Sequence, residues 1–217
     1  MATISRENTR SIEEEADFLQ LKNVDHIHFW VGNALQAMYF WWKGFGFQPV
    51  AYSGLETGNR RFASYVLQSG QIRLVFSAPY GPADEIAAHE LVHGDGVKSV
   101  AFEVDDVAEA YRQTTSRGGA GVWEPREEKD EFGTLRTAAI HTYGEVQHVF
   151  VDRSEYTGPF APTYQPLHFH AESTGLAAID HIVGNVPLGK MNTWVNFYHQ
   201  VMGFRLLIHF DDQDIST

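Results

Sequence analysis

Apolar and polar positions along the chain change their period in a set order, and this order predicts a β-α-β-β-β unit. Residues 24–31 (VDHIHFWV) are rich in β-branched and aromatic residues and predict a strand. Asn33 is a residue type that caps helices, and residues 34–45 predict a helix with a very apolar face, which Gly44 and Gly46 bring to an end. Three extended segments separated by turn residues follow, at residues 47–53, 61–68 and 72–78.

The same order returns after a short linking helix expected at residues 84–92. Residues 97–104 (VKSVAFEV) alternate cleanly and predict a strand. Asp105 or Asp106 then caps a helix with its apolar residues on one side. Further strands are expected near residues 121–124, 135–142 and 146–152, with a tight hairpin at residues 143–145 between the last two.

A third unit begins after a proline-rich stretch. Residues 154–175 contain three prolines and two glycines, and their aromatic residues indicate a linker that packs on a surface. Ile179-Asp180-His181-Ile182 then repeats Val24-Asp25-His26-Ile27 almost letter for letter, so a strand is expected here. Apolar residues at helical spacing follow up to Met202, and residues 205–210 predict the next strand.

Such modules leave one sheet face to be covered, so they are expected to occur in pairs. The predicted fold class is α+β, with two complete β-α-β-β-β modules and a truncated third. The expected organisation is a polar tail at residues 1–17, an N-terminal domain at 18–153, a linker at 154–176 and the start of a second domain at 177–217. By the spacing of the first two modules, a closed second domain needs on the order of 100 further residues, so an incomplete chain is expected.

Composition narrows the classes of function. The chain has 217 residues, 43% of them hydrophobic, and a formal net charge of −12, which argues against nucleic acid or an anionic membrane as partner. The absence of cysteine excludes disulfides and thiolate metal sites. There is no apolar run of the roughly 20 residues that a membrane span needs, and the polar start does not match a signal peptide. A cytoplasmic protein is expected.

Several histidines are candidate metal ligands, each with a structural alternative. Taken alone, a strand histidine such as His181 or His26 is more often a packed or hydrogen-bonded residue than a ligand. His168 and His170 have the spacing of a strand chelate, but they lie in the linker. His89 and His93 have a familiar metal spacing on a predicted helix, yet Glu90-Leu91 does not complete an HExxH zinc motif. The acidic cluster at residues 124–131 predicts a solvated loop.

The order of modules resembles the vicinal oxygen chelate superfamily, and within it the chain is similar to the 4-hydroxyphenylpyruvate dioxygenases over about residues 18–215. Two runs are the most specific parts of the resemblance, HGDGVK-x-VAFEV from His93 and DHIVGNVP from Asp180. Shorter matches lie at residues 25–33, 56–58, 72–77, 132–133, 141–144 and 148–153. The resemblance implies that the match is to the N-terminal portion of such an enzyme.

The resemblance also implies a mononuclear Fe(II) held by two histidines and one glutamate, with open positions for the substrate and O2. It assigns the first ligand to His181 and a place in the substrate pocket to Val183. The second histidine and the glutamate are expected outside this chain. The implied reaction converts 4-hydroxyphenylpyruvate and O2 to homogentisate and CO2 in tyrosine catabolism, in a protein expected to be a homo-oligomer.

Two alternatives remain open from the sequence. A 4-hydroxymandelate synthase uses the same substrate and metal but oxidises the benzylic carbon, and the residues that separate the two enzymes are expected outside this chain. A non-catalytic binding or assembly module is the alternative from a different class. The chain alone is expected to be inactive, because it holds a single expected ligand.

Overall fold

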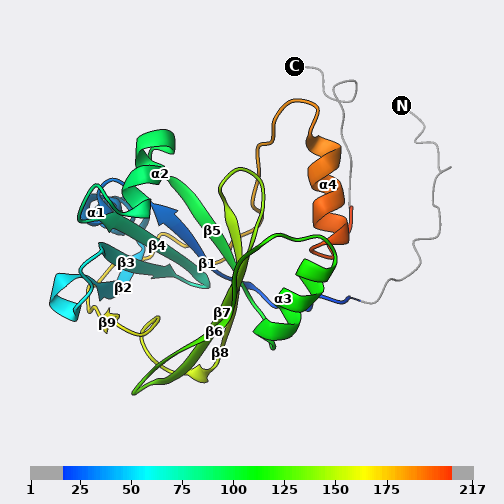
Figure 1. Ribbon diagram of the computed structural model, residues 1–217. Coiled ribbons are helices and arrows are strands. Elements are labelled where there is room, and N and C mark those ends of the chain that lie inside the picture. The colour runs from blue at the N-terminus through cyan, green and yellow to red at the C-terminus, as the bar shows by residue number, and fades with distance from the viewer. Residues whose placement is uncertain (1–16, 207–217) are drawn as a thin grey trace, which may run out of the picture.

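The computed structural model describes residues 17–206, which form a nine-stranded mixed sheet with four α-helices (Figure 1). The strand order is β6-β7-β8-β5-β1-β4-β3-β2-β9. The first module comprises β1 (Val24–Trp30), α1 (Ala34–Phe45), β2 (Gln48–Ser53), the 3-10 turn η1 (Leu55–Thr57), β3 (Phe62–Ser69) and β4 (Ile72–Pro79). After α2 (Glu85–His93), the second comprises β5 (Gly96–Glu103), α3 (Val107–Ser116), β6 (Gly121–Asp130), β7 (Gly133–His141) and β8 (Gln147–Tyr156). The last elements are β9 (Gln165–Pro166) and α4 (Met191–Gln200).

The two modules have the same internal topology, which confirms the repeat and the α+β fold class expected from the sequence. In each module the first strand pairs in parallel with the last, β1 with β4 and β5 with β8. The modules join through antiparallel pairing of β1 with β5 at the centre of the sheet. Each predicted helix of the pair begins at an aspartate or asparagine cap, with Asn33 Oδ1 accepting from Gln36 N at 2.9 Å and Asp106 Oδ1 from Glu109 N at 3.0 Å.

One face of the sheet, here called the helix face, carries the main core. Its buried residues come from both modules, from α1 and α3, and from Val201 and Met202 just after α4. The opposite face, here called the inner face, is covered partly by the linker, where Phe160 is 8% exposed and packs on Ala51, Val66 and Val75. Burial of a phenylalanine contributes roughly 1.5–3 kcal/mol, so the linker adds to the stability of the sheet that it covers. The expectation that it packs on a surface is confirmed.

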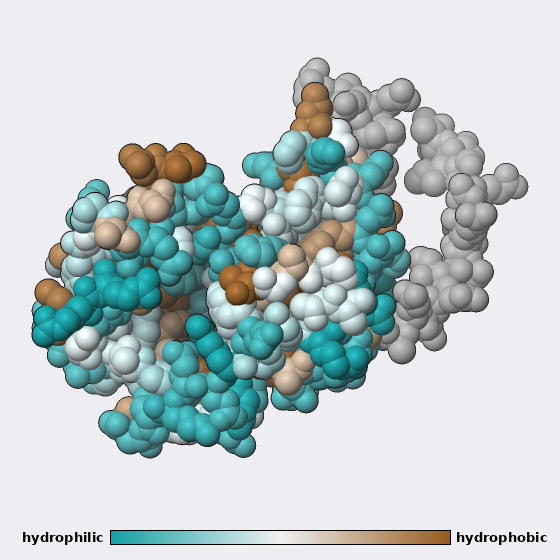
Figure 2. Space-filling model, in the orientation of Figure 1, coloured by the Kyte–Doolittle hydropathy of each residue, from teal (hydrophilic) through white to brown (hydrophobic). Residues whose placement is uncertain are grey.

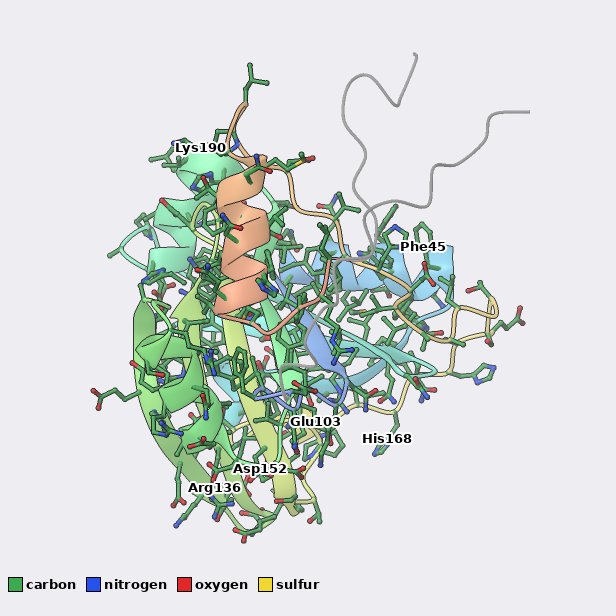
Figure 3. The ribbon with its side chains drawn as sticks, turned by 90° about the vertical axis from the view of Figure 1, so that its right-hand side faces the viewer. Phe45, Glu103, Arg136, Asp152, His168 and Lys190 are labelled. Carbon is green, nitrogen blue, oxygen red and sulfur yellow. The ribbon has the colours of Figure 1, made fainter. Side chains whose placement is uncertain are left out.

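Charged side chains gather at one end of the second module. Figure 3 labels Arg136 and Asp152 there, and Arg136 reaches Glu127 on β6 at 2.9 Å as well as Asp152 and Glu155 on β8 at 3.4 and 2.7 Å. The visible surface is largely hydrophilic (Figure 2), with a small apolar patch over α2, where Leu91 and Val92 are 88% and 73% exposed. Among the described helices none is both long and apolar enough to cross a membrane.

The prediction of a loop at residues 124–131 was wrong, because β6 continues to Asp130. The acidic residues are exposed as expected, but they lie on an edge strand that pairs with β7 alone. An edge strand with solvent on its free side needs no apolar alternation and tolerates Pro125, so the sequence pattern did not reveal it.

The strand expected around His181 is also absent. Residues 177–190 form no strand, and the described chain offers them no neighbouring strand with which to pair. The helix of the third unit is present as α4, whereas most of the strand expected at 205–210 and the tail expected at 1–17 fall outside the described residues.

Candidate functional site

Asp180 and His181 form a hydrogen-bonded pair in an exposed segment before α4. The Nδ1 atom of His181 lies 2.7 Å from Asp180 Oδ2, and the two side chains are 74% and 95% exposed. An ionised carboxylate only accepts, so Nδ1 carries the proton and Nε2 keeps a lone pair for a metal or another donor. On a strand, neighbouring residues point to opposite faces, which would keep Asp180 away from the ring of His181. The segment is not a strand, so the two side chains can meet.

His181 lies at the edge of a cavity of about 550 Å³ on the helix face of the second module. β5 contributes Val100 and Phe102, β8 contributes His148, and α4 contributes Trp194 and Tyr198. Val183 lies two residues after His181, but it does not line this cavity, and its side chain is 74% exposed.

The floor of the cavity is uncharged at neutral pH. His148 is buried, and its Nε2 lies 2.9 Å from the hydroxyl of Tyr198. Burial lowers the pKa of His148 to about 4, and burial raises the pKa of Tyr198 above its ordinary value. The floor therefore suits an aromatic or apolar group, whereas Asp180 and Arg205 add charged side chains elsewhere in the lining.

The described residues do not by themselves form the iron site that the resemblance implies. His181 is one imidazole donor with an orienting carboxylate, which fits one ligand of a facial triad. Within residues 17–206 no set of three potential ligands includes His181. The expectation that the other two ligands lie outside this chain stays a prediction.

His26, the counterpart of His181 in the first module, is a buried structural residue. Its Nδ1 lies 2.5 Å from Asp25 Oδ1, and Asp25 also receives Arg153 Nε at 2.8 Å and Arg73 Nη1 at 3.1 Å. Burial would raise the pKa of Asp25, but the hydrogen bonds from His26 and Arg153 outweigh it and hold the pKa well below its usual range. Burial lowers the pKa of His26, which is therefore neutral at pH 7.

Among residues 17–206 no set of three potential metal ligands includes His26. By the repeat of the modules, the position equivalent to a second histidine ligand falls near Ser99, and the position equivalent to a carboxylate ligand falls near His148 or Val149. Ser99 pairs across the sheet with His28, and Val149 belongs to an apolar cluster with Ala101. His28 instead lies 2.8 Å from Ser77 Oγ. These contacts agree with the packed role expected for His26 and His28.

Two other histidine pairs differ in their surroundings. His168 and His170 are exposed in the linker, as expected for surface residues. His89 and His93, in contrast, lie beside Glu145 in the β7–β8 turn, and together the three form a group able to hold a metal ion. The spacing of the two histidines is visible in the sequence, but their proximity to Glu145 is not, because only folding brings the turn to α2.

Comparison with known proteins places these features in a family context. Residues 25–134 match the Glyoxalase/Bleomycin resistance protein/Dioxygenase superfamily. The chain is 44% identical over 205 residues to a 4-hydroxyphenylpyruvate dioxygenase from Dictyostelium discoideum, covering 91% of this chain and 56% of that protein. It is 41% identical to the enzyme of that name from Tetrahymena thermophila, with 89% and 50% covered, and 40% identical to that from Danio rerio, with 90% and 51% covered. The chain therefore spans about half the length of the curated relatives it matches.

Solved structures share the fold at low sequence identity. A variant of 4-hydroxymandelate synthase from Streptomyces coelicolor aligns with a TM-score of 0.73 and 22% identity, covering 84% of this chain and 53% of that one. Methylmalonyl-CoA epimerase from Mycobacterium tuberculosis aligns with a TM-score of 0.52 and 20% identity, covering 63% and 91%. At these identities the likeness concerns the paired-module fold alone.

Proposed function

Because this chain belongs to the glyoxalase/bleomycin resistance protein/dioxygenase superfamily, we propose that it is the N-terminal portion of an iron-dependent 4-hydroxyphenylpyruvate dioxygenase. The observation that carries the proposal is the identity of 40–44% to dioxygenases of this name from three distant organisms, over about nine tenths of the chain. The paired-module fold and the Asp180-His181 pair support it.

In the proposed reaction, 4-hydroxyphenylpyruvate and O2 give homogentisate and CO2. When bound, Fe(II) supplies the activation of O2 beside the chelated 2-oxo acid. Within this chain His181 contributes one imidazole, and Asp180 holds the ring in the tautomer that leaves Nε2 for the metal. Val183, two residues further on, is proposed to contact the substrate once the rest of the pocket is assembled around the segment.

The first two modules have a supporting role in this proposal. Their sheet is continuous from β6 to β2, and the core on its helix face includes Val201 and Met202 just after α4, so the paired modules hold the segment that carries His181. We propose that this part positions the catalytic part and contributes to a homo-oligomer in the cytoplasm.

Product analysis with the full-length protein tests the proposal and separates it from its alternatives. Purified protein reconstituted with Fe(II) is given 4-hydroxyphenylpyruvate and O2, and the products are separated by chromatography. Homogentisate is expected. 4-Hydroxymandelate would identify the synthase, and the absence of O2 consumption would favour a binding or assembly module.

A further inference from the structure

α2 and the β7–β8 turn bring together three side chains that the proposed reaction does not use. His89 and His93 are four residues apart on α2, so they project from the same side of the helix. Their rings lie 4.5 Å apart, and Glu145 approaches both: its Oε2 is 3.4 Å from His89 Nδ1 and 3.2 Å from His93 Nε2.

His89 is the anchored member of this group. Its side chain is 8% exposed, and its ring packs edge-on against Trp30 at 5.2 Å. Its Nδ1 is buried and lies 3.4 Å from Glu145 Oε2 without making a well-formed hydrogen bond within residues 17–206. Leaving a buried polar atom unpaired costs about 1–3 kcal/mol, and a bound ion or water at this atom would remove that cost.

The separations of the donor atoms fit one small ion. Zinc binds imidazole nitrogen at about 2.0–2.1 Å and carboxylate oxygen at about 2.0–2.2 Å, so the edges of its tetrahedron measure about 3.3–3.5 Å. The distances of 3.4 and 3.2 Å from Glu145 Oε2 to the two histidines lie within a few tenths of an ångström of this edge. One potential ligand atom of each of the three residues lies within 4.8 Å of the other two, so side-chain movements would close the set around an ion.

A hydrogen bond to the main chain holds the turn that carries Glu145 in place. Lys98 Nζ donates to the backbone oxygen of Glu145 at 2.8 Å and holds the turn near α2. Two nitrogens and one oxygen select zinc or a related first-row ion over calcium or magnesium.

We propose that His89, His93 and Glu145 form a zinc site that connects α2 to the β7–β8 turn. The site is distinct from the one proposed at His181 and does not depend on it. It joins the segment between the two modules to the second module, and three protein ligands leave one position of the ion for solvent or a small anion.

Metal titration of the 217-residue chain tests this proposal. Apo-protein is titrated with Co²⁺, whose visible absorption reports tetrahedral coordination, and with Zn²⁺ in a calorimeter. One ion per chain is expected, with an intense Co²⁺ spectrum. A hundredfold excess of Zn²⁺ over its Kd should raise the Tm by roughly 5–10 °C.

Variants distinguish a built site from adventitious binding. His93→Ala and Glu145→Gln alter exposed side chains, so they should stay folded and weaken zinc binding by more than about 10-fold each. His89→Phe keeps a ring against Trp30 and should do the same. His168→Ala/His170→Ala removes an exposed histidine pair without a nearby glutamate, and His181→Ala removes the proposed iron ligand; both should bind zinc like the parent chain.

The proposal is overturned if no ion binds at up to 1:1 stoichiometry, or if the linker double variant weakens zinc as much as His93→Ala does. It is also overturned if folded His93→Ala and Glu145→Gln, checked by circular dichroism, bind zinc with unchanged affinity. None of these outcomes bears on homogentisate formation, so the two proposals fail separately.

Discussion

The same Asp-His dipeptide occurs in two settings, and the neighbours of each pair decide its chemistry. Asp25 and His26 are 2.5 Å apart and surrounded by two arginines and the ring of Phe160. Asp180 and His181 are 2.7 Å apart with both side chains largely in solvent. The repeat was visible in the sequence, but the arginines that enclose Asp25 lie far away along the chain, so only the resemblance distinguished the two histidines beforehand.

His181→Ala and His26→Ala in the full-length protein test this difference. We expect His181→Ala to lower iron affinity well beyond the roughly 10–100-fold typical of residues that only orient a ligand, and to abolish homogentisate formation. His26→Ala should cost about 1–3 kcal/mol of stability and leave the iron content unchanged. Iron content and product are measured on both. Loss of iron in His26→Ala with retention in His181→Ala would place the ligand in the other module.

The lowered pKa of the buried His148 predicts that the folded chain loses stability at mildly acidic pH. Its folded pKa of about 4 lies below the unfolded value of about 6.5, so the unfolded state binds the proton first as pH falls. The stabilisation is complete above pH 6.5 and decreases by about 3 kcal/mol as pH falls to 4. Urea unfolding of the chain and of His148→Gln across this range should show the weaker pH dependence in the variant; equal slopes would contradict the assignment.

At the scale of elements, hydrophobic periodicity and capping residues predicted the helices, whose formation depends mainly on local sequence. The bounds of α1 and the caps at Asn33 and Asp106 agree with expectation, because a helix makes its own hydrogen bonds. Two predictions were wrong in opposite ways. Residues 124–131 were predicted as a loop but lie mostly in β6, and residues 179–182 were predicted as a strand but form none. A strand depends on its neighbour, so polar β6 forms beside β7 whereas the apolar third-unit segment, without a neighbouring strand, does not.

Alanine substitutions at two glycines with positive φ distinguish the cost of backbone strain from the cost of a steric clash. Gly46 ends α1 with φ of 70°, and a Cβ there would lie 2.3 Å from the backbone oxygen of Glu172 in the linker. Gly58 has φ of 91° with nothing within 4 Å of such a Cβ. We expect Gly58→Ala to cost about 1–2 kcal/mol from strain alone. Gly46→Ala should cost at least twice as much by urea unfolding, and equal costs would show that the linker moves aside freely.

At the scale of the whole molecule, the sequence predicted the pairing of modules but not how the linker completes their surface. The domain boundaries stay a prediction, yet β8 continues to Tyr156, and β9 adds Gln165–Pro166 to the edge of β2. Arg153 donates to the backbone oxygen of Phe160 while it binds Asp25, so the linker and the buried ion pairs are joined. The periodicity of apolar residues in the sequence does not predict such a contact between the linker and a buried ion pair.

Chains that end at residue 157, just after β8, and at residue 176 test the role of the linker. The shorter chain loses Phe160 and Tyr164 from the inner face. We expect its free energy of unfolding to be lower by roughly 3 kcal/mol, the contribution of one buried aromatic ring and its contacts. Urea unfolding followed by fluorescence measures the free energy of unfolding of both chains. Coincident transitions would show that the linker only rests on the sheet.

The 217-residue chain should consume no O2 with 4-hydroxyphenylpyruvate and Fe(II). One imidazole competes poorly with water for iron, and the described residues form no set of three ligands that includes His181. The full-length protein is the positive control in an oxygen electrode. Turnover by the chain at a comparable rate would show that its own residues complete the site.

Both borders of the nine-stranded sheet resist further growth. On one side β6 is a row of exposed charges interrupted by Pro125, and on the other the two-residue β9 ends in Pro166. Proline offers no amide hydrogen, and charged side chains repel a like neighbour, so neither border templates the addition of another chain. The described sheet therefore offers no border that favours strand-by-strand addition, which is the way fibrils grow.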